Sequence, residues 1–319
     1  MSGAKKALAR GLTQGRTWWV VLVTLLVLAA CVGSAQARFR RSDDSSLPSN
    51  VYAIKSGGLV RTYRLYVPAS YSGKPVPLLV ALHPALSDGA GMEKLTRFDD
   101  LADRYGVIVA YPDGVARMWN ADRCCGRPMK DNIDDVGFIN DMVAKIESNY
   151  AIDTTRKYVA GFSNGAFLAH HIACVEPDAF TAYAVTGGAI TDANCPDAQP
   201  TPILLIHGTK DPRSPWDGGT TEGVYRPPVV DLARRLARRN HCSDTTTVSY
   251  ASAPAVCKTF SGCGSNEVTY CALDGVGHQW AGAPAVLPLL LGPSTDRFST
   301  TDQMWSFFQR HQRRTQYNH

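Results

Sequence analysis

Charged residues are scarce in this sequence, and internal repeats are absent. Charged side chains make up 19% of the 319 residues and apolar ones 45%, a balance that excludes a disordered chain, a coiled coil and a collagen. The lack of any repeat of about 20–50 residues argues against a solenoid or a propeller. The formal net charge is only +5, and most of it comes from four cations within residues 1–37: Lys5, Lys6, Arg10 and Arg16. The rest of the chain lacks the clustered positive charge of a nucleic-acid-binding surface, so we expect no nucleic-acid partner.

Residues 1–37 have the layout of a secretory signal peptide. A basic stretch is followed by the almost wholly apolar run 18–33, as in the n-region and h-region of such signals. Ala35-Gln36-Ala37 fits a cleavage site that releases a chain starting at Arg38, whereas Leu28-Ala29-Ala30-Cys31 resembles a bacterial lipobox that makes Cys31 a lipid anchor. An uncleaved membrane anchor is the third interpretation, because about 21 uncharged residues can just span a bilayer. All three place the body outside the cytoplasm, in the periplasm or the medium.

Cysteine pairs with C-x-x-C spacing are absent, and no histidine nearby has ligand spacing, so we expect no metal site. Apart from Cys31, the cysteines are Cys124, Cys125, Cys174, Cys195, Cys242, Cys257, Cys263 and Cys271. An even number in an exported chain predicts disulfide bonds. Short separations favour Cys174 with Cys195, and pairings within 242–271. Ring strain between neighbouring cysteines predicts that Cys124 and Cys125 each have a distant partner.

Apolar runs alternate with amphipathic segments after a polar lead-in at residues 38–50. Strands are predicted at 61–67, 76–82, 107–111, 157–160, 203–206 and 267–273. Helices are predicted at 98–105, 136–150, 165–174, 229–239 and 301–311, the last with Thr301 as its N-cap. This alternation predicts one α/β domain over residues 51–315, with a mostly parallel sheet and helices on both faces. In such sheets, sites lie at the carboxyl ends of the strands.

The motif Gly161-Phe162-Ser163-Asn164-Gly165 marks Ser163 as the candidate nucleophile. It follows the predicted strand 157–160 and opens the predicted helix 165–174, which is the context that a G-x-S-x-G nucleophile turn requires. Such a turn strains the serine backbone and exposes the hydroxyl group. A glycine-rich turn with a solvated serine is the alternative interpretation.

His278 is the candidate general base. In the α/β-hydrolase fold the triad order is serine, acid, histidine. Four histidines therefore come too early to be the base: His83, His170, His171 and His207. His278 follows the predicted strand 267–273 in a glycine-containing loop that can reach over the sheet edge. The later His241, His311 and His319 lack that placement.

Asp211 is the candidate acid that orients His278. It lies in His207-Gly208-Thr209-Lys210-Asp211-Pro212, directly after the predicted strand 203–206. A carboxylate there would hold the neutral tautomer of His278 and stabilise the imidazolium that forms during the reaction. Asp217, in the same loop, is the second candidate, and an ordinary turn aspartate is the alternative for either residue.

Two backbone N–H groups are candidates for the oxyanion hole. One is the N–H of Asn164, the residue after the nucleophile. The other is the N–H of Ala85, in the loop after strand 76–82, because Pro84 has no N–H to donate. A plain proline-containing turn is the alternative interpretation of this loop.

Together these motifs resemble the secreted polyhydroxybutyrate-depolymerase and feruloyl-esterase-like group of α/β-hydrolases over residues 58–311. The matching stretches are 59–64, 82–83, 111–114, 119–120, 124–126, 134–138, 161–165, 207–209 with Asp211, and 277–278 with Trp280. The resemblance implies Ser163, Asp211 and His278 as the triad. It also implies that Trp119 and Trp280 lie near the cleft as substrate-binding residues. Two departures stand out: His83-Pro84 replaces the usual His-Gly, and Trp280-Ala281-Gly282 replaces Trp-Pro-Gly.

The predicted function is a secreted serine carboxylic-ester hydrolase that needs no cofactor. Feruloyl or acetyl esters of polysaccharides, polyhydroxyalkanoates and small aryl esters all fit such a site. The apolar segment 283–295 (APAVLPLLLGPST) forms either a lip for a greasy substrate or a loop packed on the body. A non-catalytic binding protein on the same fold and a serine peptidase are the alternatives. The sequence leaves the oligomeric state open.

Overall fold

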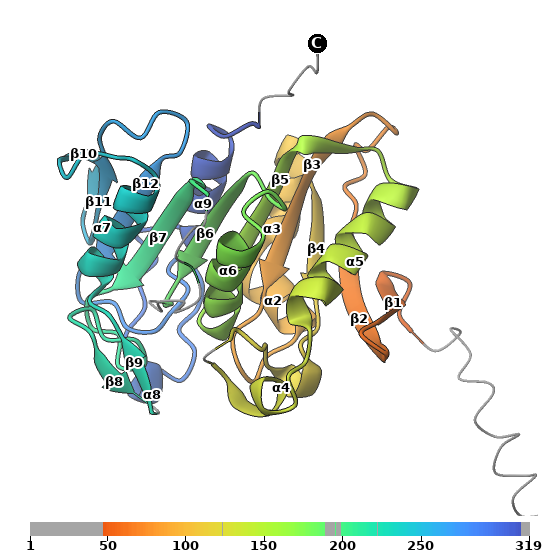
Figure 1. Ribbon diagram of the computed structural model, residues 1–319, viewed down its shortest axis with the longest axis horizontal. Helices are drawn as coiled ribbons and strands as arrows, with labels where there is room; N and C mark the ends of the chain where they lie inside the picture. The colour runs from red at the N-terminus through yellow and green to blue at the C-terminus, as the bar shows by residue number, and fades with distance from the viewer. Residues whose placement is uncertain (1–46, 123, 189–194, 196–198, 222, 314–319) are drawn as a thin grey trace, which may run out of the picture. The chain divides into compact units, whose positions relative to one another are not determined.

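A ten-stranded sheet forms the centre of the computed structural model, which describes residues 47–122, 124–188, 195, 199–221 and 223–313 (Figure 1). In sheet order the strands are β1 (Val51–Ser56), β2 (Leu59–Tyr66), β4 (Ile108–Pro112), β3 (Val76–Leu82), β5 (Ile152–Phe162), β6 (Ala182–Thr186), β7 (Ile203–Gly208), β12 (Val268–Leu273), β11 (Ala255–Phe260) and β10 (Thr246–Ser252). The six central strands, from β4 to β12 in this order, pair in parallel. At one edge β1 and β2 are added antiparallel, and at the other edge β11 and β10 are added antiparallel.

The central strands are continuous apolar runs because helices cover both faces of the sheet. On one face, α5 (Asp135–Asn149), α6 (Asn164–Val175) and α7 (Val229–Arg239) contribute buried residues to one apolar cluster. On the other face, α2 (Gly89–Thr96), α3 (Phe98–Tyr105) and α9 (Thr300–Phe308) contribute to a second cluster. Figure 1 shows α5, α6 and α7 in front of the sheet. The predicted α/β fold with a mostly parallel sheet and helices on both faces is confirmed.

The smaller elements lie in loops around this frame. They are the 3-10 turn η2 (Val115–Arg117), α4 (Gly126–Lys130), the hairpin β8 (Gly219–Thr221) and β9 (Val224–Arg226), and α8 (Pro288–Leu291). The turn η2 and α4 lie between β4 and α5, the hairpin between β7 and α7, and α8 between β12 and α9.

The N-cap predicted for the last helix is wrong. Helix α9 begins at Thr300, and its N-cap is Ser299, whose hydroxyl accepts a hydrogen bond of 3.1 Å from the N–H of Asp302. Thr301 lies inside the helix, where its hydroxyl donates to the Thr96 carbonyl at 2.6 Å. Serine and threonine both suit a cap, so tertiary contacts decide which one takes the position.

Four disulfide bonds join the eight cysteines that follow the N-terminal segment. The predicted Cys174–Cys195 bond is present, and Cys242–Cys263 and Cys257–Cys271 confirm the pairing within 242–271. The prediction of distant partners for Cys124 and Cys125 is wrong, because the two are bonded to each other across a cis peptide bond.

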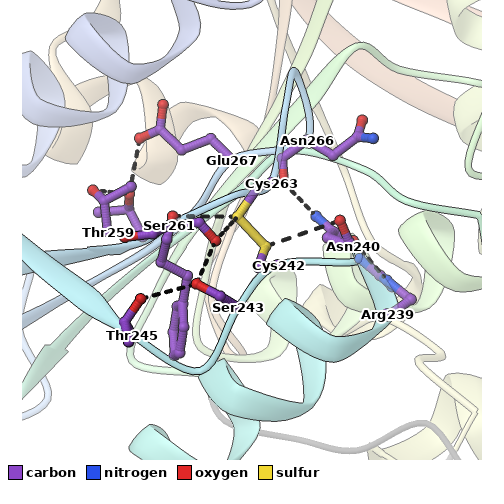
Figure 2. Close-up of a disulfide and its surroundings, with 12 residues drawn as sticks. Arg239, Asn240, Cys242, Ser243, Thr245, Thr259, Ser261, Cys263, Asn266 and Glu267 are labelled. Carbon is purple, nitrogen blue, oxygen red and sulfur yellow. Dashed lines mark hydrogen bonds between the residues drawn. A yellow bond between two sulfur atoms is a disulfide. The ribbon is translucent and has the colours of Figure 1, made fainter.

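Figure 2 shows how the Cys242–Cys263 bond ties the end of α7 to the loop before β12. Beside it, the Asn240 amide donates to the carbonyls of Thr201 at 2.7 Å and Asn266 at 2.9 Å. Asn240 is buried, so these bonds satisfy an amide that would otherwise be costly in the interior. The disulfide and the amide together hold α7 against the starts of β7 and β12.

The predicted signal peptide, the lipobox cysteine Cys31, the anchor and most of the lead-in 38–50 lie outside the described residues. Within the described part of the chain, no helix is long and apolar enough to cross a membrane.

Glu267 joins the end of α9 to the start of β12. Its carboxylate accepts hydrogen bonds of 2.8 Å from Arg310 and from the Thr269 hydroxyl, and lies 3.4 Å from Nε2 of His311. Partial burial would raise the pKa of Glu267, but hydrogen bonds from His311, Arg310 and Thr269 lower it to about 2. The carboxylate therefore contributes stability that is fully present above its unfolded pKa of about 4.5 and is lost as the pH falls towards 2.

Replacing Glu267 with glutamine is expected to lower the free energy of unfolding at pH 7 by on the order of 2 kcal/mol. The difference should shrink when urea unfolding is repeated between pH 4.5 and pH 3. Asp231→Asn is the control, because Asp231 forms an exposed ion pair with Arg234 within α7 and should change stability by less than about 0.5 kcal/mol. A Glu267→Gln effect that does not vary with pH would contradict the assignment.

Candidate active site

Ser163 occupies a strained turn between β5 and α6. Its backbone has φ 53° and ψ −116°, a region that costs free energy for a non-glycine residue. Its N–H donates to the Thr186 carbonyl at 3.0 Å, which ties the turn to the end of β6. The strain is sustained because the surrounding strands fix both ends of the turn.

Both glycines of the motif are required by close packing. A Cβ on Gly161 would overlap the backbone of Gly165, and one on Gly165 would overlap the carbonyl groups of Leu82 and His83. Helix α6 can therefore start directly against the end of β3 only when both positions lack a side chain. This packing is the physical reason for the G-x-S-x-G pattern in this chain.

The structure brings Ser163, His278 and Asp211 together at the carboxyl ends of β5, β12 and β7. Nε2 of His278 lies 2.8 Å from Oγ of Ser163, and Nδ1 lies 2.7 Å from Oδ2 of Asp211. Because a carboxylate only accepts, Nδ1 carries the proton and Nε2 is free to accept from the serine hydroxyl. His278 and Asp211 are both buried, so the pair is shielded from water.

The Asp211 carboxylate is held from several sides. Its Oδ1 accepts bonds of 2.8 Å from the N–H groups of both Arg213 and Ser214. Burial alone would raise the pKa of Asp211, but the hydrogen bond from His278, the nearby His207 and the Ser214 N–H lower it below its usual value. Asp211 therefore stays ionised at neutral pH, as an orienting carboxylate must.

His207, which its early place in the chain excludes as the base, is the second histidine beside Asp211. Its Nε2 donates to the Ser214 carbonyl at 2.6 Å and lies 3.5 Å from Oδ2 of Asp211. Burial lowers the pKa of His207, although the Asp211 carboxylate opposes this. The neutral ring thus closes the turn that presents Asp211 to His278.

Asp217 does not meet the histidine. It is exposed, in a turn in which the Gly218 N–H donates to the Pro215 carbonyl at 3.0 Å. The structure gives it no contact with His278, so Asp211 is the better-placed carboxylate.

The two candidate oxyanion donors follow neighbouring strands. Leu82 of β3 pairs with Gly161 of β5, and Ala85 and Asn164 each come three residues later. The Asn164 N–H belongs to the first turn of α6, where backbone donors have no acceptor within the helix. The Pro84 carbonyl accepts from Nδ1 of His83 at 2.8 Å, and Nε2 of that ring accepts from the Gly114 N–H at 2.9 Å. The buried neutral imidazole thereby fixes the loop that carries Ala85.

The Asn164 side chain has a role that is not among the predictions from the sequence. Its Oδ1 accepts from the Trp119 N–H at 2.7 Å, and its Nδ2 donates to the Trp119 carbonyl at 3.1 Å. The Trp119 indole N–H in turn donates to the His83 carbonyl at 2.9 Å. These bonds link the residue after the nucleophile to the loop after β3. A buried amide at the start of an apolar helix was the available signal.

The two tryptophans that the resemblance implies as substrate-binding residues lie near the site, as expected, but both are buried. Trp119 is 0% exposed and Trp280 is 2% exposed. Trp280 packs edge-on against Phe162 and donates to the Thr301 hydroxyl at 3.0 Å. Both indoles are covered because each N–H finds its acceptor inside the protein.

Among the described residues, no group of three or more histidine, cysteine, aspartate or glutamate side chains is arranged to hold a metal ion.

Comparisons with known proteins agree with this geometry. Residues 61–199 match the family described as "Esterase PHB depolymerase". A probable feruloyl esterase C from Aspergillus niger is 29% identical over 301 residues, which cover 91% of this chain and 97% of that one. Feruloyl esterase B from Piromyces equi is 28% identical over 66% of this chain, and the match spans only 41% of that protein. The acetyl xylan esterase from Aspergillus awamori has the same fold, with a TM-score of 0.56, 16% identity, and coverage of 82% of this chain and 99% of that one.

The family match and the relatives named feruloyl esterase confirm the resemblance that the motifs indicate, to the feruloyl-esterase and polyhydroxybutyrate-depolymerase-like group of α/β-hydrolases.

Exchanging the two loop aspartates for asparagine distinguishes their roles. Asp211→Asn is expected to lower turnover of p-nitrophenyl acetate by about 10⁴-fold, because an amide favours the wrong tautomer of the base. Asp217→Asn should change the free energy of unfolding by only about 0.5 kcal/mol or less and leave turnover near that of the parent. If Asp217→Asn is the inactive variant, the acid has been misplaced.

Replacing Asn164 with alanine keeps the backbone N–H but removes the side-chain bonds to Trp119. The N–H of the buried Trp119 would lose its acceptor, and its carbonyl would keep only the Cys125 N–H at 3.2 Å. We therefore expect the free energy of unfolding in urea to fall by about 1–3 kcal/mol. Asn149→Ala, at the exposed end of α5, is the control and should cost less than about 0.5 kcal/mol. Equal losses of unfolding free energy in the two variants would show that the Asn164 amide does not stabilise the loop of Trp119.

Proposed function

We propose that the protein is a serine esterase in which Ser163 is the nucleophile, His278 the general base and Asp211 the orienting acid. The observation that carries the proposal is the unbroken hydrogen-bond chain from Oγ of Ser163 through His278 to Asp211. The loops after three strands that are separate in sequence, β5, β7 and β12, supply these groups at the carboxyl ends of the parallel strands. A structural role alone gives no reason for this convergence.

The reaction follows from this geometry. Oγ of Ser163 attacks the ester carbonyl carbon while Nε2 of His278 takes the hydroxyl proton. The Asp211 carboxylate stabilises the imidazolium, and the N–H groups of Asn164 and Ala85 donate to the carbonyl oxygen as it becomes negative. His278 then gives its proton to the leaving alcohol, which leaves an acyl group on Ser163. Water, deprotonated by His278, attacks this acyl-enzyme and releases the acid.

The substrates proposed are feruloyl or acetyl esters of polysaccharides, and polyhydroxyalkanoate-type esters. The relatives named feruloyl esterase support the first class, and the match to the polyhydroxybutyrate depolymerase family supports the second. We further propose that the enzyme acts outside the cytoplasm, released or held by a lipid on Cys31. The four disulfide bonds support an oxidising compartment.

Ser163→Ala is expected to lower p-nitrophenyl acetate turnover by about 10⁴-fold or more, since removing a triad member leaves only binding and oxyanion stabilisation. Labelling by a fluorophosphonate, which needs an activated serine, should be lost at the same time. Unchanged thermal unfolding would show that the fold is intact. More than a few per cent residual activity in folded protein would reject the nucleophile, and parent protein that fails to react with the probe would indicate a non-catalytic binder. A panel of methyl ferulate, acetylated xylan and hydroxybutyrate oligomers then ranks the substrate classes.

A further inference from the structure

Four aliphatic side chains protrude from the loop between β12 and α9. Val286, Leu287, Leu289 and Leu290, here called the apolar lip, are all exposed. Leu289 is 105% exposed, and Leu287 and Leu290 are 63% and 60% exposed. Single exposed leucines are common on protein surfaces, but four within five positions form a patch of the kind that marks an interaction site. The structure thus decides against a loop packed on the body.

The lip is fixed in place by the residue next to the catalytic histidine. The buried Gln279 donates from Nε2 to the carbonyls of Val286 and Gly292, both at 2.8 Å, and its Oε1 accepts from the Val286 N–H at 3.0 Å. The two ends of the loop are therefore joined through one side chain. Leu287, at φ 43°, is held in the left-handed region, which a bulky residue avoids unless its surroundings impose it.

The backbone of the lip segment also contacts the catalytic loop directly. The N–H of His278 donates to the Leu291 carbonyl at 2.6 Å, and the N–H of Gly277 donates to the Pro293 carbonyl at 2.8 Å. A Cβ on Gly277 would overlap the Leu291 carbonyl and Gly292. The exposed leucines therefore lie on a rigid segment that is hydrogen-bonded to the base of the triad.

The chemistry of the lip indicates what binds it. Residues 283–295 contain no charged side chain and no aromatic ring. An anionic membrane surface attracts clustered lysine and arginine, which this segment lacks. The four side chains of the lip also provide neither hydrogen-bonding groups nor aromatic faces for a sugar. Exposed aliphatic side chains on a segment that is hydrogen-bonded to the loop of His278 match a water-insoluble, uncharged and aliphatic ester.

We propose that the apolar lip is a docking surface for the aliphatic surface of a water-insoluble polyester, and that it holds the polymer beside Ser163. This inference rests on the proposed esterase function. Because Gln279 orders the lip before substrate arrives, docking loses little conformational entropy. Polyester chain segments at the surface of the polymer then have only to reach Ser163.

Docking is tested separately from catalysis with Ser163→Ala protein and suspended poly(3-hydroxybutyrate) particles. Adding Leu289→Ser and Leu290→Ser should weaken adsorption about 10-fold or more, as expected when two buried aliphatic side chains are removed from a contact. Val60→Ser is the matched control, because Val60 is 75% exposed on β2, at the other end of the strand order. It should leave adsorption within about twofold of the parent.

In protein with Ser163 intact, the double serine variant should lower the ratio of particle hydrolysis to p-nitrophenyl acetate hydrolysis by about 10-fold. Unaltered adsorption and an unaltered ratio would overturn the proposal. Parent protein that sediments equally well with phosphatidylcholine vesicles would assign the lip to lipid, and a parent dimer that dissociates in the double variant would assign it to self-association. Either result would also overturn the proposal. Failure of the esterase assignment would instead appear as activity retained by Ser163→Ala.

Discussion

The start of α6 against the end of β3 is the packing contact on which the site depends. Without side chains at Gly161 and Gly165, the helix comes so close that Ser163 is forced to φ 53°. This places Oγ above the strand ends and leaves the first N–H groups of α6 without helical acceptors. The same contact sets the Asn164 N–H beside the loop of Ala85, since β3 and β5 are neighbours in register. One steric constraint therefore positions Ser163, the proposed nucleophile, together with one proposed oxyanion donor.

A buried polar network supports the contact between α6 and β3. Asn164 binds the backbone of Trp119, and the next residue, Asn120, donates its N–H to Asp135 at 2.7 Å. Asp135 pairs with Arg61 at 2.6 Å, and both side chains are almost completely buried. Burial raises the pKa of Asp135, while the Arg61 guanidinium and the Asn120 N–H oppose that shift. A buried ion pair is weak evidence for stability. Here its bonds define one path for the loop that underlies the oxyanion donors.

Features set by local chain geometry could be predicted from the sequence, and those set by distant contacts could not. Ser163, Asp211 and His278 each follow a recognisable buried strand, so chain order and strand ends suffice to bring them together. The burial of Trp119 depends on acceptors at His83 and Asn164, which the sequence does not place in space. Strand β6 is missing from the predicted strands, because its apolar run is only five residues long. The sequence also could not show that the hydroxyl of Thr301, the predicted N-cap, binds the carbonyl of Thr96, which lies 205 residues earlier in the chain.

The apolar lip and the triad place opposite demands on the same short segment. The base of the triad needs a fixed backbone, because its ring must meet Ser163 and Asp211 at once. Exposed leucines need a reason to remain in water, because burying them would be favourable. Gln279 satisfies both demands, because its amide joins the two ends of the loop. The leucines therefore cannot fold onto the protein without breaking its three hydrogen bonds and disturbing the bond from the His278 N–H to the Leu291 carbonyl. A loop free to collapse would cover its leucines and, through the Leu291 carbonyl, shift the base. The exposure of the lip is therefore a consequence of the rigidity that the proposed catalysis requires. A lip that is kept exposed in this way is available to a water-insoluble substrate.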